Sequence, residues 1–398
     1  MNAPVAPAHV PPQLVRHFDY LDSPGDADVF DFFGRLHDGP DLFYSTANHG
    51  HWVATRYEDM AHILEHTADF SSEAHTVPRE GKPFPLPLVE YDGPSHADFR
   101  KLLHPFFQPR AVAALQSRAR EDTVRLIEGF RARGGCDFTS EFAFRMPIAI
   151  MMGLLGLPDA DREHLVGLAH GLIRGDSVQR KAVFADIFRY FGEQVIPQRR
   201  AQPGDDVFSA LVHGKVEGGR SLTDQELLGM GALLIAAGLD TVANVLCFMI
   251  RFLAENPGHR RQLVGQPERI DDAVEELLRR FHVTVIARMV TRDLEYKGLV
   301  FKARELILLP TPLAGIDPRR FPDPLTVDFA RADKRSLVFG RGPHLCIGAF
   351  LGRAELRVFL AEWMRRIPDF AVKPGAQLRS RSGRTLSIPE LPIVWPPP

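Results

Sequence analysis

A long apolar stretch, from Leu227 to Leu253, constrains the fold of this 398-residue chain more than any other feature. It is long enough to cross a bilayer as a helix, but Asp240, Asn244 and Arg251 interrupt it. A membrane span should not carry Asp and Asn at its centre, because unsatisfied polar groups are costly in hydrocarbon. We therefore interpret the stretch as a long helix buried inside a globular protein, and we predict no membrane span.

The rest of the chain supports a mainly helical body with small sheets. Apolar periodicity predicts helices over residues 28–37, 97–103, 110–131, 141–155, 159–175, 180–198, 210–213 and 224–255. Alternating runs predict strands over 51–55, 283–290, 295–301, 306–309 and 386–395. Because no Gly/Ser linker divides the chain, we predict one mainly α domain over residues 1–398, with the Pro-rich residues 1–25 as a loosely ordered N-terminal arm.

Residues 75–94 hold five prolines and two glycines, which predicts a long irregular loop. Loops of this length are uncommon unless they are lids or binding loops. Phe outnumbers Tyr and Trp by 28 to 6 and 3, so most of the aromatic surface lacks a polar group and favours an apolar pocket.

Charge and cysteine content exclude several classes of protein. A net charge of −2 argues against binding to nucleic acid or anionic membranes, which requires an excess of Lys and Arg. The three cysteines, Cys136, Cys247 and Cys346, are odd in number and form no CxxC pair, so neither a disulfide framework nor a zinc site is indicated. We see no signal peptide at the N-terminus. These observations predict a cytoplasmic protein.

Cys346 ends a glycine-rich loop that precedes a predicted helix. Gly340 and Gly342 allow backbone conformations that other residues avoid, and Gly348 allows close packing against the start of the helix. The free N–H groups of a helix N-terminus favour thiolate over thiol, and a thiolate in such a place suits the axial ligation of a haem iron. The alternative is an unreactive cysteine buried in a turn.

Two further patterns lie upstream of this loop. Glu276 and Arg279 are spaced i, i+3 and therefore share one helix face. In the long apolar helix, Asp240 and Thr241 follow Gly238, although a buried acid is costly and a mid-helix glycine costs about 1 kcal/mol relative to alanine. This combination favours a functional site, with local widening of the helix. The alternative is that Thr241 bonds to a preceding carbonyl and Asp240 bridges to a neighbouring helix.

In this order, the patterns resemble those of the cytochrome P-450 haem-thiolate monooxygenases. Phe339 to Gly348 fits the loop pattern F-x-x-G-x-x-x-C-x-G, Glu276 to Arg279 fits E-x-x-R, and Ala237 to Thr241 fits [A/G]-G-x-[D/E]-T. The resemblance spans roughly residues 19–396 and is closest to the bacterial terpene-oxidising branch that includes camphor hydroxylases. It implies the fold of that family, with haem b held between the long central helix and the helix after the cysteine.

The resemblance also implies roles for individual residues. Cys346 would bind the iron within the loop that contains Phe339, Gly340 and Gly348, and Gly238 would make room for dioxygen beside the proton-delivering Asp240 and Thr241. Three cationic or hydrogen-bonding residues would meet the haem propionates, namely Arg100, Arg288 and His344. Glu276, Arg279 and Arg331 would hold the core on the haem side. The substrate pocket would be lined by Phe84, Leu233, Ala236, Thr241, Thr284 and Ile286.

Two departures from the camphor-hydroxylating pattern bear on the substrate. Camphor hydroxylases usually place a tyrosine in the Pro-rich loop, but counting eight residues back from Asp92 gives Phe84, and Tyr91 is out of register. Ile286 stands where the pattern has an aspartate. Loss of one neutral hydrogen bond weakens binding by about 1 kcal/mol. We therefore expect a compact apolar terpenoid or norisoprenoid as substrate, and poor binding of camphor.

The chain shows no GxGxxG motif and no P-loop, so electrons must come from another protein. By resemblance, this donor is a small 2Fe-2S ferredoxin with its reductase, and the enzyme is a monomer that uses O2. A basic docking face could consist of Arg100, Lys101, Arg110, Arg341, Arg353 and Arg357. The alternatives are a camphor-type monoterpene hydroxylase, a peroxide-using haem-thiolate enzyme, a non-catalytic haem-binding protein, and a hydrolase built on Gly175-Asp176-Ser177.

Overall fold

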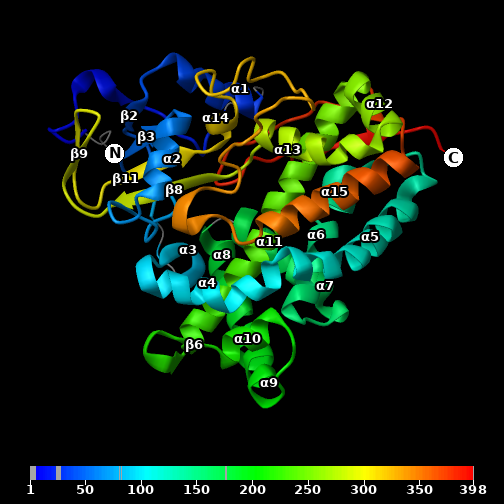
Figure 1. Cartoon of the computed structure of the whole chain (residues 1–398), viewed down its shortest axis with the longest axis horizontal. Coiled ribbons are helices and arrows are strands. Elements are labelled where there is room, and N and C mark those ends of the chain that lie inside the picture. Colours follow the sequence, from blue (N-terminus) through cyan, green and yellow to red (C-terminus); the bar gives the residue numbers. More distant parts are fainter. Residues whose placement is uncertain (1–5, 24–27, 80, 82, 175–176, 398) are drawn as a thin grey trace. The chain divides into compact units, whose positions relative to one another are not determined.

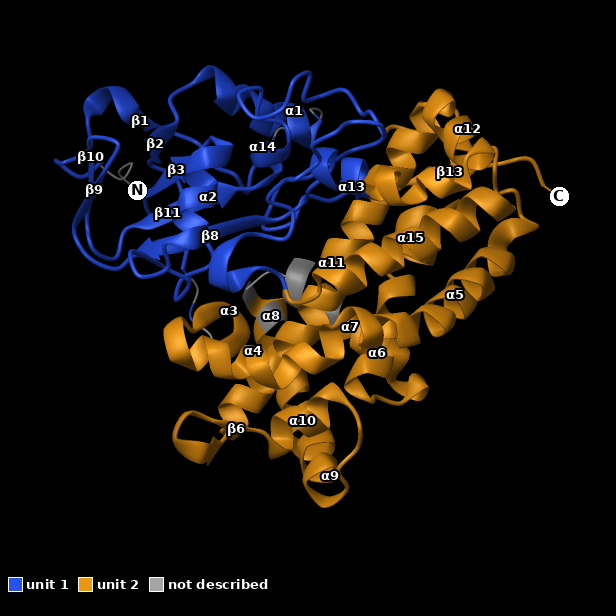
Figure 2. Cartoon of the chain, in the orientation of Figure 1, with its two compact units in different colours: residues 1–81, 275–346, 378–389 blue, residues 82–274, 347–377, 390–398 orange. Residues whose placement is uncertain are grey.

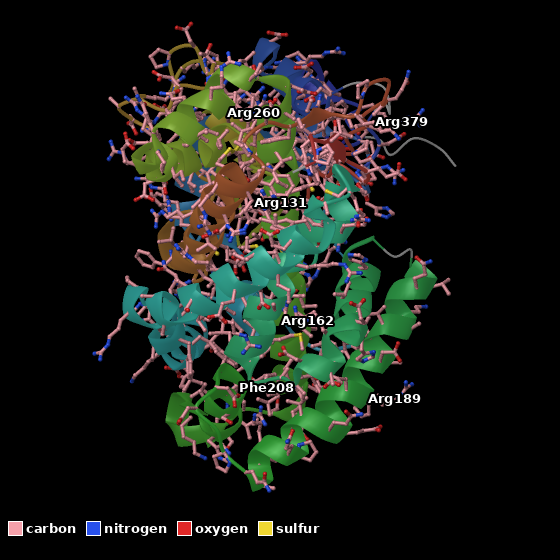
Figure 3. The ribbon with its side chains drawn as sticks, turned by 90° about the vertical axis from the view of Figure 1, so that its right-hand side faces the viewer. Arg131, Arg162, Arg189, Phe208, Arg260 and Arg379 are labelled. Carbon is pink, nitrogen blue, oxygen red and sulfur yellow. The ribbon has the colours of Figure 1, made fainter. Side chains whose placement is uncertain are left out.

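The computed structural model describes residues 6–23, 28–79, 81, 83–174 and 177–397 (Figure 1). These residues divide into two compact units, each assembled from separate stretches of the chain (Figure 2). Unit 1 comprises residues 1–81, 275–346 and 378–389, and unit 2 comprises residues 82–274, 347–377 and 390–398. Residues 1–5 and 24–25 of the predicted N-terminal arm, and Gly175 and Asp176 of the hydrolase alternative, lie outside the described residues.

Unit 1 is built on a six-stranded mixed sheet in the order β1-β2-β3-β11-β8-β4. Its longer strands are rich in Val, Ile and Leu and are almost wholly buried. In β11, for example, side chains on both faces of the sheet are buried, so apolar and polar residues do not alternate. The strands of this unit are β1 (Val15–Arg16), β2 (Leu42–Ser45), β3 (His51–Ala54), β4 (Phe70–Ser71), β8 (Val285–Val290), β9 (Leu294–Tyr296), β10 (Leu299–Phe301) and β11 (Leu306–Pro310). Its helices include α1 (Val29–Gly34), α2 (Tyr57–Glu65) and α14 (Pro312–Gly315).

Unit 2 is mainly helical and is organised around α11 (Asp224–Glu255). Thr223 caps this helix in a reciprocal arrangement with Glu226, so its start is fixed by the sequence. The other helices are α3 (Pro87–Glu90), α4 (Gly93–Phe107), α5 (Pro109–Arg131), α6 (Met146–Leu155), α7 (Arg162–Arg174), α8 (Ser177–Ile187), α9 (Ile196–Ala201), α10 (Val207–His213), α12 (Pro257–Gly265) and α15 (Ala349–Arg366). Figure 1 shows α15 beside α5, which it contacts extensively. Helix α13 (Ile270–Arg280) includes the boundary between the two units.

Unit 2 also holds short strands and two π-helical segments. The strands β5 (Gly135–Asp137), β12 (Ala371–Val372) and β13 (Pro392–Val394) form one small sheet, and β6 (Lys215–Val216) pairs with β7 (Arg220–Ser221). The π segments are Thr139–Ala143, before α6, and Phe188–Val195, between α8 and α9. Together the two units confirm the predicted mainly α class with small sheets.

Among the described residues, α11 alone is long and apolar enough to span a membrane by length and composition. Most of its apolar window is buried inside the structure, which is typical of a core helix in a globular protein. Its observed bounds match the predicted helix over 224–255.

The expectation of a loosely ordered arm is wrong for residues 6–23. Val15 and Arg16 pair with Tyr44 and Ser45 in the edge of the unit 1 sheet, and the hydroxyl of Tyr20 donates a hydrogen bond to the carbonyl of Val77 at 2.5 Å. These partners lie far along the chain, so the proline content that predicted disorder does not decide the local structure. Likewise, the predicted loop over 75–94 contains the short helix α3 and the start of α4.

Candidate functional site

The loop before Cys346 is closed by its own backbone. The N–H of Cys346 donates to the carbonyl of Phe339 at 2.8 Å, and the N–H of Leu345 donates to that of Gly342 at 3.1 Å. This arrangement leaves the Cys346 side chain exposed at the end of the loop. The backbone of Cys346 is therefore fixed by main-chain hydrogen bonds within its own loop.

Two glycines make this loop possible, for different reasons. Gly340 and Gly342 have φ of 72° and 70°, in the left-handed region that favours glycine. A Cβ on Gly342 would also lie 2.7 Å from the carbonyl oxygen of Leu64, whereas at Gly340 the nearest atom would be 3.8 Å away. Gly342 is thus required both for its backbone angle and for the close approach of the loop to the end of α2.

Cys346 lies two residues before Gly348, which is the N-cap of α15. Gly348 makes no side-chain capping hydrogen bond, since it has no side chain. The predicted position of the cysteine near a helix N-terminus is therefore correct, and unpaired N–H groups at such an end favour the thiolate. The neighbouring Leu345 and Phe350 are exposed large apolar side chains, Phe350 by 54 %.

The E-x-x-R pair forms a buried ionic cluster in unit 1. The guanidinium of Arg279 donates to both carboxylate oxygens of Glu276, at 2.7 and 2.8 Å, and both side chains are fully buried. Arg331 donates from Nε to the same carboxylate at 3.0 Å, and the N–H of Asp328 adds a further hydrogen bond at 3.0 Å. A carboxylate with this many donors satisfies the condition under which a buried charge is stable.

Midway along α11, Asp240 is 3 % exposed and its carboxylate accepts a hydrogen bond from the Asn244 amide at 2.8 Å. The Thr241 hydroxyl donates to the carbonyl of Ala237 at 3.0 Å. The latter contact is the bonding expected of a helical threonine, and it is also compatible with a functional hydroxyl. Asn244 was not selected from the sequence, although an amide four residues after a buried acid on an apolar helix is a usable signal.

The described residues of α11 remain α-helical through this stretch, so the predicted local widening is not observed. Small residues occupy this part of the helix instead. Ala237 is exposed in the middle of a mostly buried helix, and a Cβ on Gly238 would lie 2.1 Å from the terminal methyl group of Met151 on α6. Gly238 is therefore a site of close helix packing, a role that sequence reasoning missed.

The predicted substrate residues divide between the two units. In unit 1, Thr284 and Ile286 alternate with buried neighbours and are partly exposed, and Arg288, two residues further along β8, is buried. In unit 2, Leu233 and Ala236 of α11 are partly exposed.

Phe84, by contrast, is 6 % exposed, and its ring meets that of Phe184 on α8 edge-to-face at 5.3 Å between centroids. Phe184 was not selected from the sequence, because nothing local to either residue indicates the contact.

Comparisons with known proteins were consistent with this geometry. The Cytochrome P450 family model matches residues 268–395. "Probable cytochrome P450 127A1" of Sinorhizobium fredii is 37 % identical, over 98 % of this chain and 96 % of that protein. The chain belongs to the cytochrome P450 family. Mycinamicin IV hydroxylase/epoxidase of Micromonospora griseorubida is 33 % identical over 86 % of the chain and 89 % of that enzyme.

Solved structures of cytochromes P450 cover almost the whole chain. The crystal structures of CYP101J2 and CYP101C1 both align with a TM-score of 0.91, at 35 % and 34 % identity. They cover 98 % of this chain, and 99 % and 100 % of their own chains respectively. These matches confirm the fold and the recognition made from the sequence, and they support the bacterial branch that was identified there.

As a cytochrome P450, this chain is an oxidoreductase whose cofactor is haem b, and it acts with O2, a substrate and a redox partner. The residues present fit that cofactor. Cys346 offers an exposed sulfur donor next to apolar Leu345 and Phe350, and such surroundings suit a thiolate ligand and a flat, apolar macrocycle. On α11 of unit 2, Ala237 is exposed and carries only a methyl group.

The residues expected to meet the haem propionates are placed as follows in the P450 chain. Arg288 is 4 % exposed and donates to the carbonyl of Ala287 at 2.8 Å. Arg100 on α4 and His344 in the loop before Cys346 are half-buried. A buried guanidinium and a half-buried imidazole or guanidinium are suitable partners for carboxylates.

The predicted basic docking face is partly neutralised by local ion pairs. Arg341 pairs with Glu65 at 2.5 Å, and Arg357 pairs with Asp271 at 2.8 Å. Lys101 and Arg110 are exposed on α4 and α5. Arg353 donates to the carbonyl of Ala349 at 3.4 Å, and Arg100 is half-buried. The positive charge available to a partner is therefore smaller than the six cations counted from the sequence.

Proposed function

We propose that this cytochrome P450 hydroxylates an unactivated C–H bond of a small apolar terpenoid or norisoprenoid, using O2 and electrons from a 2Fe-2S ferredoxin. The observation that carries the monooxygenase part is the exposed Cys346 thiol, fixed before α15 by the hydrogen bond from its N–H to Phe339. When bound, haem b supplies the oxidising chemistry, for which a thiolate ligand donates electron density.

Two residues of α11, Asp240 and Thr241, would deliver protons to the site. Asn244 holds the Asp240 carboxylate in one orientation, and the carboxylate can take up a proton from solvent and pass it on. The Thr241 hydroxyl donates to the carbonyl of Ala237 in the structure, and rotation about its side-chain bond would let it donate its proton elsewhere in the site instead. The residues of α11 around these two side chains are mostly apolar, which limits the access of bulk water to the reacting atoms.

Three residues would neutralise the two haem propionates. Arg288 is held in the interior by β8 of unit 1, while Arg100 lies on α4 of unit 2 and His344 lies in the cysteine loop. Each can donate hydrogen bonds to a carboxylate, and together they offset a charge that would be costly to bury without partners.

An apolar substrate is supported by the character of the proposed lining. Leu233, Ala236 and Ile286 offer only hydrocarbon, and Phe84 has no hydroxyl with which to bind a ketone. Tyr91, the nearby tyrosine, directs its hydroxyl toward Glu226 at 3.5 Å. A camphor-type activity is the second candidate, because the chain aligns with two CYP101 structures over 98 % of its length.

The substrate proposal is tested with camphor and bornane, which is camphor without its ketone. We expect bornane to shift the haem spin state at least as strongly as camphor, with similar or tighter binding. Replacing Phe84 with Tyr should then favour camphor over bornane by roughly fivefold, which corresponds to about 1 kcal/mol for one hydrogen bond. Tight camphor binding with a complete spin shift in the unaltered enzyme would contradict the apolar substrate.

Proton delivery is tested by Thr241→Ala. We expect the variant to oxidise its electron donor at a near-normal rate with substrate present, while most of the electrons appear as hydrogen peroxide rather than hydroxylated product. Unchanged coupling would remove Thr241 from the proton path. A protein that binds haem but never turns over with any donor would favour the non-catalytic alternative.

Electron supply by a ferredoxin, a cytoplasmic location and a monomeric state complete the proposal. Lys101 and Arg110 are exposed cations on which an acidic partner could dock. Turnover should therefore fall as ionic strength rises, because contacts between exposed charges are screened. A flat salt profile would argue against electrostatic docking.

A further inference from the structure

Strand β8 of unit 1 begins where its ladder with β11 ends. The pairing runs as far as Val285 and Pro310, so the next two residues in register are Thr284 and Thr311. The main-chain N–H of Thr311 turns instead to the carbonyl of Leu309, at 2.9 Å. The carbonyl of Thr284 therefore needs a different donor if the start of β8 is to stay beside β11.

A side chain supplies that donor. The hydroxyl of Thr311 donates to the carbonyl of Thr284 at 2.5 Å. Thr311 is also the N-cap residue of α14, but its side chain makes no capping hydrogen bond there. The hydroxyl is thus committed to Thr284, and it takes the place that the N–H of Thr311 would hold in a continued antiparallel ladder.

A buried histidine that was not selected from the sequence completes the contact. Nε2 of His282 lies 3.4 Å from the Thr311 hydroxyl, and His282 is 3 % exposed. Burial lowers the pKa of His282 to about 3, so the ring is neutral at pH 7 and carries one N–H. Because the hydroxyl proton is committed to Thr284, the hydroxyl oxygen can only accept, which places the ring proton on Nε2. Nδ1 has no hydrogen-bond partner among the described residues, so Thr311 is the polar contact of this ring.

The other edge of this stretch is held by main chain. The N–H of Val285 donates to the carbonyl of Arg384 at 2.8 Å. The carbonyl of Val283 accepts from the N–H of Leu386 at 2.7 Å. Along an extended strand, the main-chain groups of successive residues point to opposite edges. The neighbours of Thr284 are therefore fixed on one edge, and the position of Thr284 on the other edge depends on the Thr311 hydroxyl.

This dependence assigns a role to two residues outside the proposed substrate lining. We propose that His282 and Thr311 are positioning residues, which set where Thr284 and Ile286 stand in the substrate site. Thr284 and Ile286 are partly exposed, and alternation along the strand places them on one face. The inference rests on the proposed function for the assignment of that face to substrate, but the hydrogen bonds are independent of it. A displacement of the Thr284 carbonyl moves both side chains together, so His282 acts on substrate affinity and on the carbon that is attacked without touching the substrate.

The first test is hydrogen exchange on the holoenzyme after Thr311→Val. Valine keeps the shape of threonine but has no hydroxyl, so exchange at the amides of Val285 and Leu386 should accelerate about tenfold. Thr291→Val is the matched control, because the Thr291 hydroxyl also donates to a main-chain carbonyl, that of Ala68 at 2.7 Å, just beyond the other end of β8. The control should leave exchange at the two amides unchanged.

The second test replaces the imidazole of His282 with two different amides. Nε2 of glutamine reaches about as far from the backbone as Nε2 of histidine, whereas the amide nitrogen of asparagine ends near the position of Nδ1. We therefore expect His282→Gln to keep the donor to Thr311 and His282→Asn to lose it. The dissociation constant of bornane, measured by the haem spin shift, should rise about fivefold in His282→Asn and stay within about twofold in His282→Gln.

Two further readouts accompany this pair of variants. Exchange at the amides of Val285 and Leu386 should accelerate in His282→Asn and not in His282→Gln. The ratio of hydroxylated products from bornane should likewise change only in His282→Asn. The Soret band of the reduced carbon-monoxide complex should be the same in both variants, since neither substitution touches the loop before Cys346.

The outcomes separate the positioning role from the identity of the substrate. Unchanged exchange in Thr311→Val, or equal acceleration in Thr311→Val and Thr291→Val, would overturn the role of Thr311. Equal effects of His282→Gln and His282→Asn on exchange and on bornane binding would overturn the role of His282. If exchange responds as expected but neither bornane nor any terpenoid shifts the spin state of the unaltered enzyme, the positioning residues stand and the proposed substrate class falls.

Discussion

Two irregular segments of this cytochrome P450 are held in place by opposite means. The loop from Phe339 to Cys346 is closed by its own backbone hydrogen bonds and by glycines in the left-handed region. The Pro-rich segment, residues 83–91, is held by side chains and by a glycine that belong to α8, α4 and α11. The loop that contains Cys346 is therefore held mainly by its own main chain, whereas the Pro-rich segment depends on its neighbours.

The difference matches what each segment has to do. An axial ligand must hold one geometry, and geometry fixed by local main-chain contacts changes little when distant parts of the chain move. A segment held by a few dispersion contacts opens locally at a lower cost in free energy than a hydrogen-bonded turn. Five substitutions test how far this contrast holds.

The largest effect is expected from Cys346→Ala. Because the loop is closed by the N–H of Cys346 and not by its sulfur, the loop should keep its shape. The reduced carbon-monoxide complex should nevertheless lose the red-shifted Soret band of thiolate ligation, and turnover should become undetectable. The control is thermal unfolding, which should change little in the haem-free protein. A retained red-shifted band would mean that another group binds the iron.

A smaller effect is expected from two glycine substitutions in the same loop. Gly342→Ala should lower the free energy of unfolding by about 3 kcal/mol, because it adds a clash with Leu64 to an unfavourable backbone angle. Gly340→Ala has the angle without the clash and should cost about 1 kcal/mol. Chemical denaturation measures both values. Equal losses would show that contact with α2 does not support the loop.

The anchor of the Pro-rich segment should respond to pH. Burial would raise the pKa of Glu226, but hydrogen bonds from Arg220 and Thr223 outweigh burial and hold this pKa below its usual 4.5. A lowered carboxyl pKa means that the ionised form stabilises the fold above pH 4.5, and that this contribution is lost as the pH falls through the folded-state value. The free energy of unfolding of Glu226→Gln should therefore differ from that of the unaltered enzyme at pH 7, and the two values should converge at acid pH.

The measurement for Glu226 is the unfolding free energy of both proteins between pH 7 and pH 3. Hydrogen exchange at Tyr91 should follow the same course, whereas exchange within the loop before Cys346 should not. A stability difference that stays constant over this range would show that the charge of Glu226 does not anchor the segment.

The smallest effect is expected from Tyr91→Phe. The contact between the Tyr91 hydroxyl and Glu226 is long, at 3.5 Å, and the ring contact with Phe99 would survive. The loss in unfolding free energy should be about 0.5 kcal/mol or less. Burial, and then the charge of Glu226, raise the pKa of Tyr91. The tyrosine therefore keeps its proton at neutral pH and can be the donor in this hydrogen bond. A loss well above 1 kcal/mol would make the hydroxyl the main anchor.

The features that could be predicted from the sequence are those made by local contacts. The cysteine loop and α11 could be predicted in detail, because glycine positions, a capping pair and apolar periodicity are local signals. The E-x-x-R pattern, followed by a later arginine, also predicted that Glu276, Arg279 and Arg331 act together. The structure brings these three side chains into one cluster.

Features made by distant partners were missed or predicted wrongly. Residues 6–23 were expected to be loose, yet Val15 and Arg16 extend a sheet through strand pairing that no local pattern reveals. Phe184 and Gly229 acquire their contacts with residues 84 and 85 only when α8 and α11 approach that segment. Two-residue strands such as β6 and β12 are too short to show alternation.

The way the chain is shared between the two units also bears on its synthesis. Unit 1 draws on the first, middle and late parts of the sequence, and Val29 donates its backbone N–H to the side chain of Ser380 across 351 positions. While the ribosome is still translating, the early strands must wait for partners that do not yet exist. Unit 1 therefore cannot fold progressively from its N-terminus during translation. The exposed apolar strands of the nascent chain must be kept from aggregating until translation is nearly finished.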